Sequence, residues 1–178
     1  MPPLVIQAAL VALVVTAAVY DFRFRRIPNW LVLTGFCAGL ALNTALGGWA
    51  GLRLAAVGFA GAFGLYFFLY MLRAMGAGDV KLMGAVGSLV GWDLWLRVFL
   101  AAALTGGVVA LVMIIITGRV RRTFWNIGFI LSEFLRFRAP YLRREELNVK
   151  SEKAVTLPHG VAIAVGTLTT LAILWTAS

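Results

Sequence analysis

Six long apolar stretches occupy most of this sequence and restrict what it can fold into. A bilayer core needs about 20 mostly apolar residues for each helical crossing. We expect spans at Leu4 to Tyr20, Trp30 to Leu46, Leu52 to Leu72, Val80 to Leu96, Val98 to Thr117 and Leu157 to Thr176. Glycines thin the fourth span and Trp92-Asp93 interrupts it, so an end near Gly91 is the alternative for that helix. The predicted fold is therefore all-α, a polytopic membrane protein built as a bundle of six transmembrane helices.

The composition agrees with a membrane protein and leaves no room for a separate soluble domain. Of the 178 residues, 62% are hydrophobic and 13% are charged, whereas soluble domains are nearer half apolar and a quarter charged. The first apolar stretch is followed, not preceded, by its arginine cluster, so we interpret it as a mature helix and not a signal peptide. We expect one transmembrane domain over residues 1–178.

The net charge of +9 is placed between the predicted spans. Lys and Arg follow the first, third and fifth spans, while the second and fourth connections are almost free of them. Basic connections mark the cytoplasmic side, so the pattern predicts that both termini face outward. This placement argues against nucleic acid as the partner, although a basic protein of this kind could in principle neutralise phosphates.

The longest stretch without a span, Gly118 to Thr156, contains the segment RTFWNIGFILSEFLRF. Phe124, Ile127, Leu131 and Phe134 recur in it at helical spacing, with arginines at both ends. This pattern is typical of an amphipathic helix that lies in the interface against membrane lipids. A re-entrant segment or a docking surface for a partner is the alternative.

Three acidic residues, Asp21, Asp79 and Asp93, lie at the ends of predicted spans. Such carboxylates are often only interfacial, but ionisable groups at membrane depth are costly and tend to mark function. Asp21 closes the first span and Asp79 opens the fourth, so the topology puts both on the cytoplasmic side. Asp93 belongs to the opposite side and cannot join them.

Two neighbouring carboxylates cannot both ionise cheaply, so one keeps a proton while the other stays charged. Such a pair can act as acid and base and activate water for peptide hydrolysis. This chemistry needs no metal and no cofactor. His159 is the one histidine and cannot build a metal site alone, and neither a GxSxG nor an HExxH motif occurs.

Gly76 and Gly78 precede Asp79 in the stretch GAGDVK. Glycine permits backbone conformations that other residues resist, so we expect the chain to bend here and a substrate backbone to approach Asp79. An ordinary turn between helices is the alternative.

Two stretches together resemble the prepilin peptidases, membrane aspartic proteases with a GxGD motif. The stretch DFRFRRIPN, from Asp21 to Asn29, is similar to the family's first aspartate followed by a basic link and Ile-Pro-Asn. The stretch GAGDVKLMG, from Gly76 to Gly84, is similar to the second aspartate motif. The span count, order and orientation resemble the family over essentially the whole chain.

The resemblance implies that Asp21 and Asp79 are the catalytic pair and that a type IV pilin-like precursor is the substrate. It implies a multi-pass protein of the inner (cytoplasmic) membrane whose active site faces the cytoplasm. Residues that would shape the site or contact the substrate are Gly76, Gly78, Pro28, Asn29, Lys81 and His159. We expect His159 to have a packing role at the interface and Lys81 to act as a membrane anchor.

The chain departs from the larger, bifunctional members of that family. Only a short link separates Asp21 from Trp30, and Cys37 is the one cysteine, so the paired cysteines of the methylating members are missing. The resemblance is therefore to short, peptidase-only members that serve Flp or tight-adherence pili, or to archaeal preflagellin peptidases. The sequence sets neither the pilin nor the oligomeric state.

Two other classes of function fit a small apolar protein of this kind. A transporter or channel would carry its carboxylates near the bilayer midplane. A noncatalytic membrane subunit of a pilus or secretion assembly would tolerate replacement of both aspartates.

Overall fold

The computed structural model describes residues 1–72, 75–116, 118, 125 and 159–177, nearly all of which are helical. The helices are α1 (Leu4–Phe24), α2 (Asn29–Met71), α3 (Ala77–Ile116) and α5 (His159–Thr176). All four are long and apolar enough to cross a membrane, and the described residues contain no strand. The prediction of an all-α membrane protein is confirmed. The predicted interfacial helix after Gly118 lies outside the described residues.

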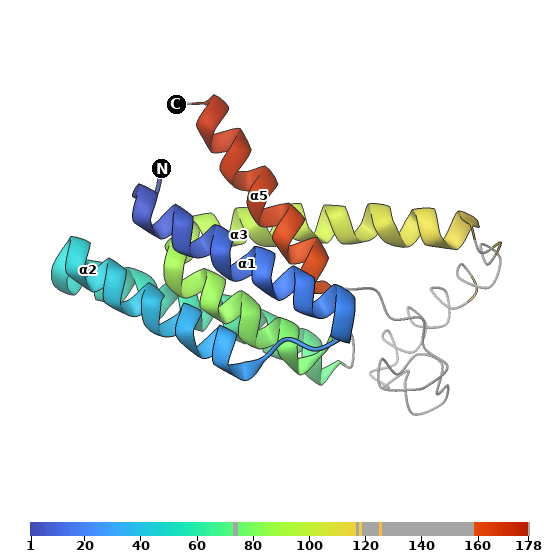
Figure 1. The fold of residues 1–178 in the computed structure, drawn as a ribbon, viewed down its shortest axis with the longest axis horizontal. Coiled ribbons are helices and arrows are strands. Elements are labelled where there is room, and N and C mark those ends of the chain that lie inside the picture. The colour runs from blue at the N-terminus through green and yellow to red at the C-terminus, as the bar shows by residue number, and fades with distance from the viewer. Residues whose placement is uncertain (73–74, 117, 119–124, 126–158, 178) are drawn as a thin grey trace.

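Helices α2 and α3 contain 43 and 40 residues, and each doubles back on itself (Figure 1). A straight helix of that length would measure about 60 to 65 Å, twice the roughly 30 Å bilayer core. The break in α2 is Gly48, with φ 55° and ψ −135°. The break in α3 is Gly91, with φ 76° and ψ −176°. Both glycines have the positive φ that side-chain-bearing residues rarely adopt.

The two breaks change how the predicted spans are separated. The second and third predicted spans both lie in α2, and Gly48 falls in the gap expected between them. The fourth and fifth both lie in α3, but the break is at Gly91 and not near Arg97. The first part of α3 therefore ends at Gly91, the alternative end that the sequence left open, and not at Leu96, because the positive φ of Gly91 breaks the helix there.

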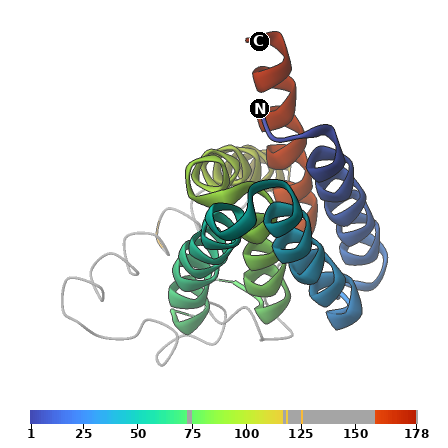
Figure 2. The same ribbon diagram turned by 90° about the vertical axis from the view of Figure 1, so that its left-hand side faces the viewer.

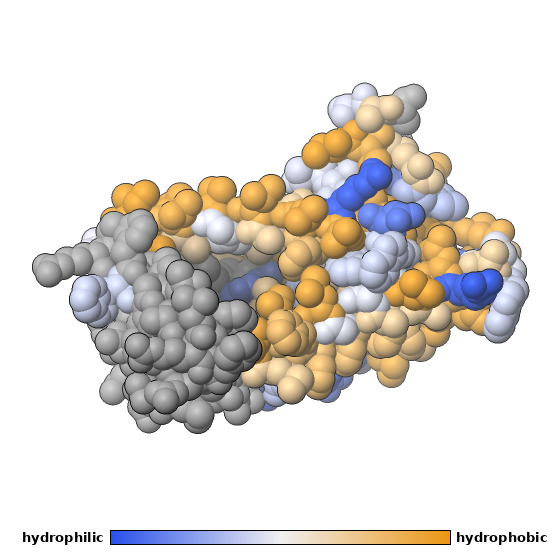
Figure 3. Space-filling model, turned by 180° about the vertical axis from the view of Figure 1, so that it is seen from behind, coloured by the Kyte–Doolittle hydropathy of each residue, from blue (hydrophilic) through white to orange (hydrophobic). Residues whose placement is uncertain are grey.

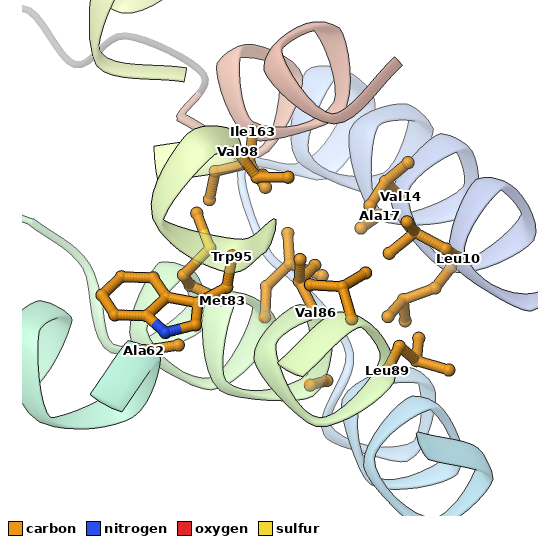
Figure 4. Close-up of a cluster of buried hydrophobic side chains, with 14 of the residues drawn as sticks. Leu10, Val14, Ala17, Ala62, Met83, Val86, Leu89, Trp95, Val98 and Ile163 are labelled. Carbon is orange, nitrogen blue, oxygen red and sulfur yellow. The ribbon is translucent and has the colours of Figure 1, made fainter. Parts of the chain in front are cut away.

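The first part of α3 is the centre of the bundle (Figure 2). Every residue from 82 to 91 is buried, which is the pattern of a helix surrounded on all sides. Side chains from α1, α2, α5 and the second part of α3 pack against it in one core (Figure 4). Members of this core include Leu10, Val14, Ala17, Ala62, Met83, Val86, Leu89, Trp95, Val98 and Ile163.

Small residues let α2 and α3 approach closely. A Cβ added at Gly58 would collide with the carbonyl oxygen of Gly87, and one added at Gly39 would collide with Ser88. Close packing of glycines is a common way to join helices in membranes, where burial from water supplies no driving force between them. The glycines that interrupt the apolar pattern of the fourth predicted span are therefore packing positions.

Asn43 adds polar contacts to the same interface. Its side-chain amide donates to the carbonyl oxygens of Gly39, Ser88 and Leu89 at 3.0, 3.0 and 3.1 Å. The last two carbonyls lie just before the break at Gly91, where the helix can no longer satisfy them all itself. Asn43 thus ties α2 to the turn of α3.

The outer faces of the helices are apolar, as Figure 3 shows for one side of the molecule. Large side chains such as Leu104, Ile115 and Ile116 are 69 to 79% exposed. A soluble monomer rarely exposes so much contiguous apolar surface, so these faces fit contact with lipid.

Candidate active site

Asp21 lies in the last turn of α1, with 8% of its surface exposed. Its Oδ2 accepts a hydrogen bond from the backbone N–H of Gly160 at 2.8 Å. Gly160 is in the first turn of α5, where N–H groups have no partner within their own helix. The start of α5 therefore fixes one oxygen of the Asp21 carboxyl.

Asp79 lies in the first turn of α3 and is also 8% exposed. Its Oδ2 accepts from the backbone N–H of Gly76 at 3.2 Å, and its own N–H donates to the Gly76 carbonyl at 3.2 Å. A carboxyl at the third helical position that reaches back to the residue before the helix is half of a capping box. The GAGD stretch thus fixes Asp79 at the N-terminus of α3.

The two aspartates line one cavity of about 740 Å³ at the end of the bundle where α1 ends and α2 and α3 begin. The carboxyl of Asp79 lies within electrostatic range of Asp21. The other residues around the cavity are Tyr20, Phe24, Arg25, Arg26, Ile27, Pro28, Asn29, Gly76, Ala77, Gly78 and Lys81. The structure therefore brings together two buried carboxylates that are far apart in the sequence.

The short link between α1 and α2 forms one wall of this cavity. Arg25 ends α1 in the left-handed conformation, and its N–H donates to the Asp21 carbonyl at 2.9 Å. Pro28 precedes α2 with φ −65°, a value that the proline ring favours before a helix. Asn29 then accepts a hydrogen bond at Oδ1 from Lys81 Nζ at 2.9 Å. This bond joins the start of α2 to α3 across the cavity.

Gly76 and Gly78 line the cavity, but neither has a positive φ. The unusual backbone conformation that the sequence suggested is therefore not found at either residue. Space is tight at Gly76, where an added Cβ would lie 3.3 Å from Asp79 Oδ2. At Gly78 the nearest atom would be Ile27 Cβ at 3.4 Å, an ordinary contact.

His159 begins α5 and lies within electrostatic range of Asp79. It lines a second, apolar cavity, which also includes Tyr66. Tyr66 is 2% exposed. The sequence analysis missed Tyr66 and Gly160. A phenol inside an apolar span was a signal for Tyr66. Gly160 directly follows His159, a predicted site residue, but its contact with Asp21 depends on how α5 packs.

Asp93 lies away from this site, as expected. It lines a third cavity with Arg53 and Arg97, beside the start of α1 and the breaks in α2 and α3. Within the described residues, no three His, Cys, Asp or Glu side chains come together in a group that could hold a metal ion. Two carboxylates, without a metal ligand set, are what the described part of the site offers.

The fold and this cavity define a helical membrane protein with two buried aspartates at one end of its bundle. The chain matches the type IV leader peptidase family over residues 8–111. Because this match covers more than half of the sequence, the chain belongs to that family.

Similar proteins carry the name prepilin leader peptidase/N-methyltransferase. The one from Myxococcus xanthus is 35% identical over 123 residues, covering 65% of this chain and 36% of the relative. The one from Burkholderia pseudomallei is 34% identical over 110 residues, covering 58% of this chain and 35% of the relative. The one from Pectobacterium carotovorum is 31% identical over 121 residues, covering 63% of this chain and 43% of the relative. The matches thus span less than half of these relatives, and no solved structure matches the chain.

Proposed function

We propose that this protein is a membrane aspartic endopeptidase that removes the short N-terminal leader of a type IV pilin-like precursor. The observation that carries this proposal is the shared cavity of Asp21 and Asp79, two buried carboxyls whose Oδ2 atoms are each fixed by a backbone N–H. Membership of the type IV leader peptidase family supports the same substrate class.

The chemistry follows from the pairing of the two carboxyls. One is ionised and removes a proton from water, whose oxygen then forms a bond to the peptide carbonyl carbon. The other is protonated and donates to the carbonyl oxygen. When the tetrahedral intermediate collapses, the C–N bond breaks, a proton passes to the leaving nitrogen, and both carboxyls return to their starting states. The backbone N–H groups of Gly160 and Gly76 each hold one oxygen of a carboxyl, which leaves the other oxygen of each carboxyl to take part in the reaction.

The membrane arrangement belongs to the same proposal. Gly48 and Gly91 divide α2 and α3 into two spans each, which gives six spans with α1 and α5. Lys and Arg follow the first, third and fifth spans, so the cavity faces the cytoplasm. Cleavage then takes place at the inner membrane. The chain works as a single domain on Flp or tight-adherence type substrates, without methylating the new terminus.

The position of the carboxyls favours a protease over a transporter or channel. Asp21 is in the last turn of α1 and Asp79 in the first turn of α3, so both lie at helix ends and not near the middle of a span. Arg25, Arg26 and Lys81 around the cavity give no electrostatic attraction for a basic leader. Contacts outside this cavity must therefore contribute to recognition.

The test is cleavage of a candidate precursor in membranes, with mass spectrometry of the new N-terminus. Asp21→Asn and Asp79→Asn each keep an oxygen that can accept from Gly160 or Gly76, so the local folds should survive while acid and base are lost. Asp93→Asn, in the third cavity, is the matched control. We expect the first two variants to be folded and inactive and the control to be active. Cleavage by either of the first two variants would show that its aspartate is structural and would overturn the mechanism.

A further inference from the structure

An apolar groove of about 400 Å³ lies between α5 and the second part of α3. From α3 it is lined by residues that include Phe99, Ala103, Gly107 and Ala110, which recur at helical spacing and so share one face. From α5 it is lined by residues that include Val161 and Val165. The hydroxyl of Thr105, a polar lining residue, already donates to the Ala101 carbonyl at 2.8 Å. The groove therefore favours an apolar occupant.

The groove begins beside the two aspartates. His159 and Tyr66 line it, and the residue after His159, Gly160, donates its N–H to Asp21 Oδ2 at 2.8 Å. Contacts between Gly106 and Ala162, and between Gly166 and Ala102, set an antiparallel register in which His159 is level with about residue 109. From this level the groove extends to Phe99, which is about 15 Å along the helix at 1.5 Å per residue.

This length corresponds to about three turns of helix, or half of the bilayer core. A polypeptide inside the membrane has to satisfy its own backbone hydrogen bonds, so a segment that enters the groove from the membrane is a helix. Small residues on the α3 face allow a second helix to approach closely. Ala103 and Gly107 are exposed, so this face is open.

We infer that this groove seats the first three turns of an apolar helix of the substrate, and that the cleaved bond lies just outside it at the aspartates. This inference rests on the proposed function, because it takes the occupant to be the polypeptide that is cut. A helix seated in the groove presents its end to the cavity of Asp21 and Asp79. The groove then supplies the recognition that the basic rim of that cavity does not.

Gly107 offers a test that should leave the fold intact. An added Cβ there meets no atom within 4 Å, and leucine is a better helix former than glycine. Gly107→Leu therefore adds an apolar side chain to the groove from a position where the Cβ has open space. Gly64 in α2 is the matched control, because it is also exposed, also has nothing within 4 Å, and does not line the groove.

Two substrates separate recognition from chemistry. One is a precursor with its apolar helix, and the other is a soluble peptide that carries only the leader and the cleavage site. We expect Gly107→Leu to lower kcat/KM for the precursor by roughly tenfold or more, the scale of an overpacked contact, and to leave the soluble peptide unaffected. Gly64→Leu should change neither. Equal cleavage of the precursor by both variants, or equal loss of both substrates by Gly107→Leu, would overturn the inference.

A direct binding measurement distinguishes failure of this inference from failure of the proposed function. A photoreactive side chain is placed at residue 107 or at residue 64 in an Asp79→Asn background, where the substrate is not consumed. We expect crosslinks to the precursor's apolar helix from residue 107 alone. If residue 107 crosslinks to the precursor but the unmodified protein does not cleave it, the proposed protease function is overturned while the groove still binds the helix. If the unmodified protein cleaves the precursor but residue 107 does not crosslink to it, the inference about the groove is overturned and the protease function stands.

Discussion

The backbone N–H of Gly160 donates to Oδ2 of Asp21 at 2.8 Å, across 139 residues of sequence. The contact is close enough that a Cβ on Gly160 would lie 2.9 Å from Asp21 Cβ and 3.0 Å from Oδ2. The last described helix therefore meets the first one at the candidate catalytic carboxyl. Glycine is required here because the backbone of α5 lies so close to Asp21, and not because Gly160 has an unusual φ.

Gly160→Ala should displace the Asp21 carboxyl and lower cleavage by roughly tenfold or more, because the methyl group overpacks this contact. The bundle should remain folded, since the site lies at the end of both helices. Activity on the precursor and the midpoint of thermal unfolding in detergent are the two measurements. Gly64→Ala, at an open position, is the control and should retain activity. Full activity of Gly160→Ala would show that the contact does not position Asp21.

The bond between Lys81 Nζ and Asn29 Oδ1 leads to a second prediction. Both residues are exposed, so we expect Lys81→Met or Asn29→Ala to change the free energy of unfolding by less than about 1 kcal/mol. If the bond positions the cavity wall, each variant should lower kcat/KM by a similar factor. The double variant should then be no worse than either single one.

The measurement is a double-mutant cycle on kcat/KM, with thermal unfolding as the check on the fold. If the losses in kcat/KM of the two single variants multiply in the double variant, the two residues act separately on the substrate. A loss confined to Lys81→Met would favour a direct electrostatic role for the lysine.

The sequence predicted the proximity of the two aspartates better than it predicted the chain's path. Asp21 and Asp79 were paired correctly in one cavity because span ends alternate between the two sides of a membrane, which is a local and countable property. The contact of Gly160 with Asp21 could not be predicted, because it depends on where α5 packs. The role of the glycines near Asp79 also differed, since Gly76 acts as a capping partner and has no positive φ.

The break in α3 shows the same limit for the fold. Hydropathy alone favoured a boundary near Leu96, because the residues from Val80 onward stay largely apolar. The structure turns at Gly91 since the chain there adopts φ 76° and packs against Leu54. The sequence showed an interruption near Gly91 as an alternative, but only the backbone angle of Gly91 shows that the central helix ends there.

Gly91→Ala should therefore be strongly destabilising. With φ 76° and ψ −176°, the backbone lies in a region that is essentially restricted to glycine, and a forced side chain there costs roughly 1 to 3 kcal/mol. The added Cβ would also lie 2.5 Å from Leu54 Cδ2. Gly47→Ala, beside the other break and with nothing within 4 Å, is the control. Unfolding midpoints that fall equally in both variants would contradict the assigned role of Gly91.

Asn43 gives the last prediction, a stability effect that should leave the chemistry alone. Its amide donates to the Ser88 and Leu89 carbonyls between α2 and α3, so Asn43→Leu leaves buried acceptors unpaired at a cost of roughly 1 to 3 kcal/mol. Thr44→Val is the matched control, because the Thr44 hydroxyl bonds to Leu40 within its own helix on an exposed face. We expect denaturant unfolding to show a large loss for Asn43→Leu and a small one for Thr44→Val. Because Asn43 lines the cavity of Asp93 and not that of Asp21, the folded fraction of Asn43→Leu should cleave at the unmodified rate. A lower rate per folded molecule would mean that the turn at Gly91 is coupled to the aspartates.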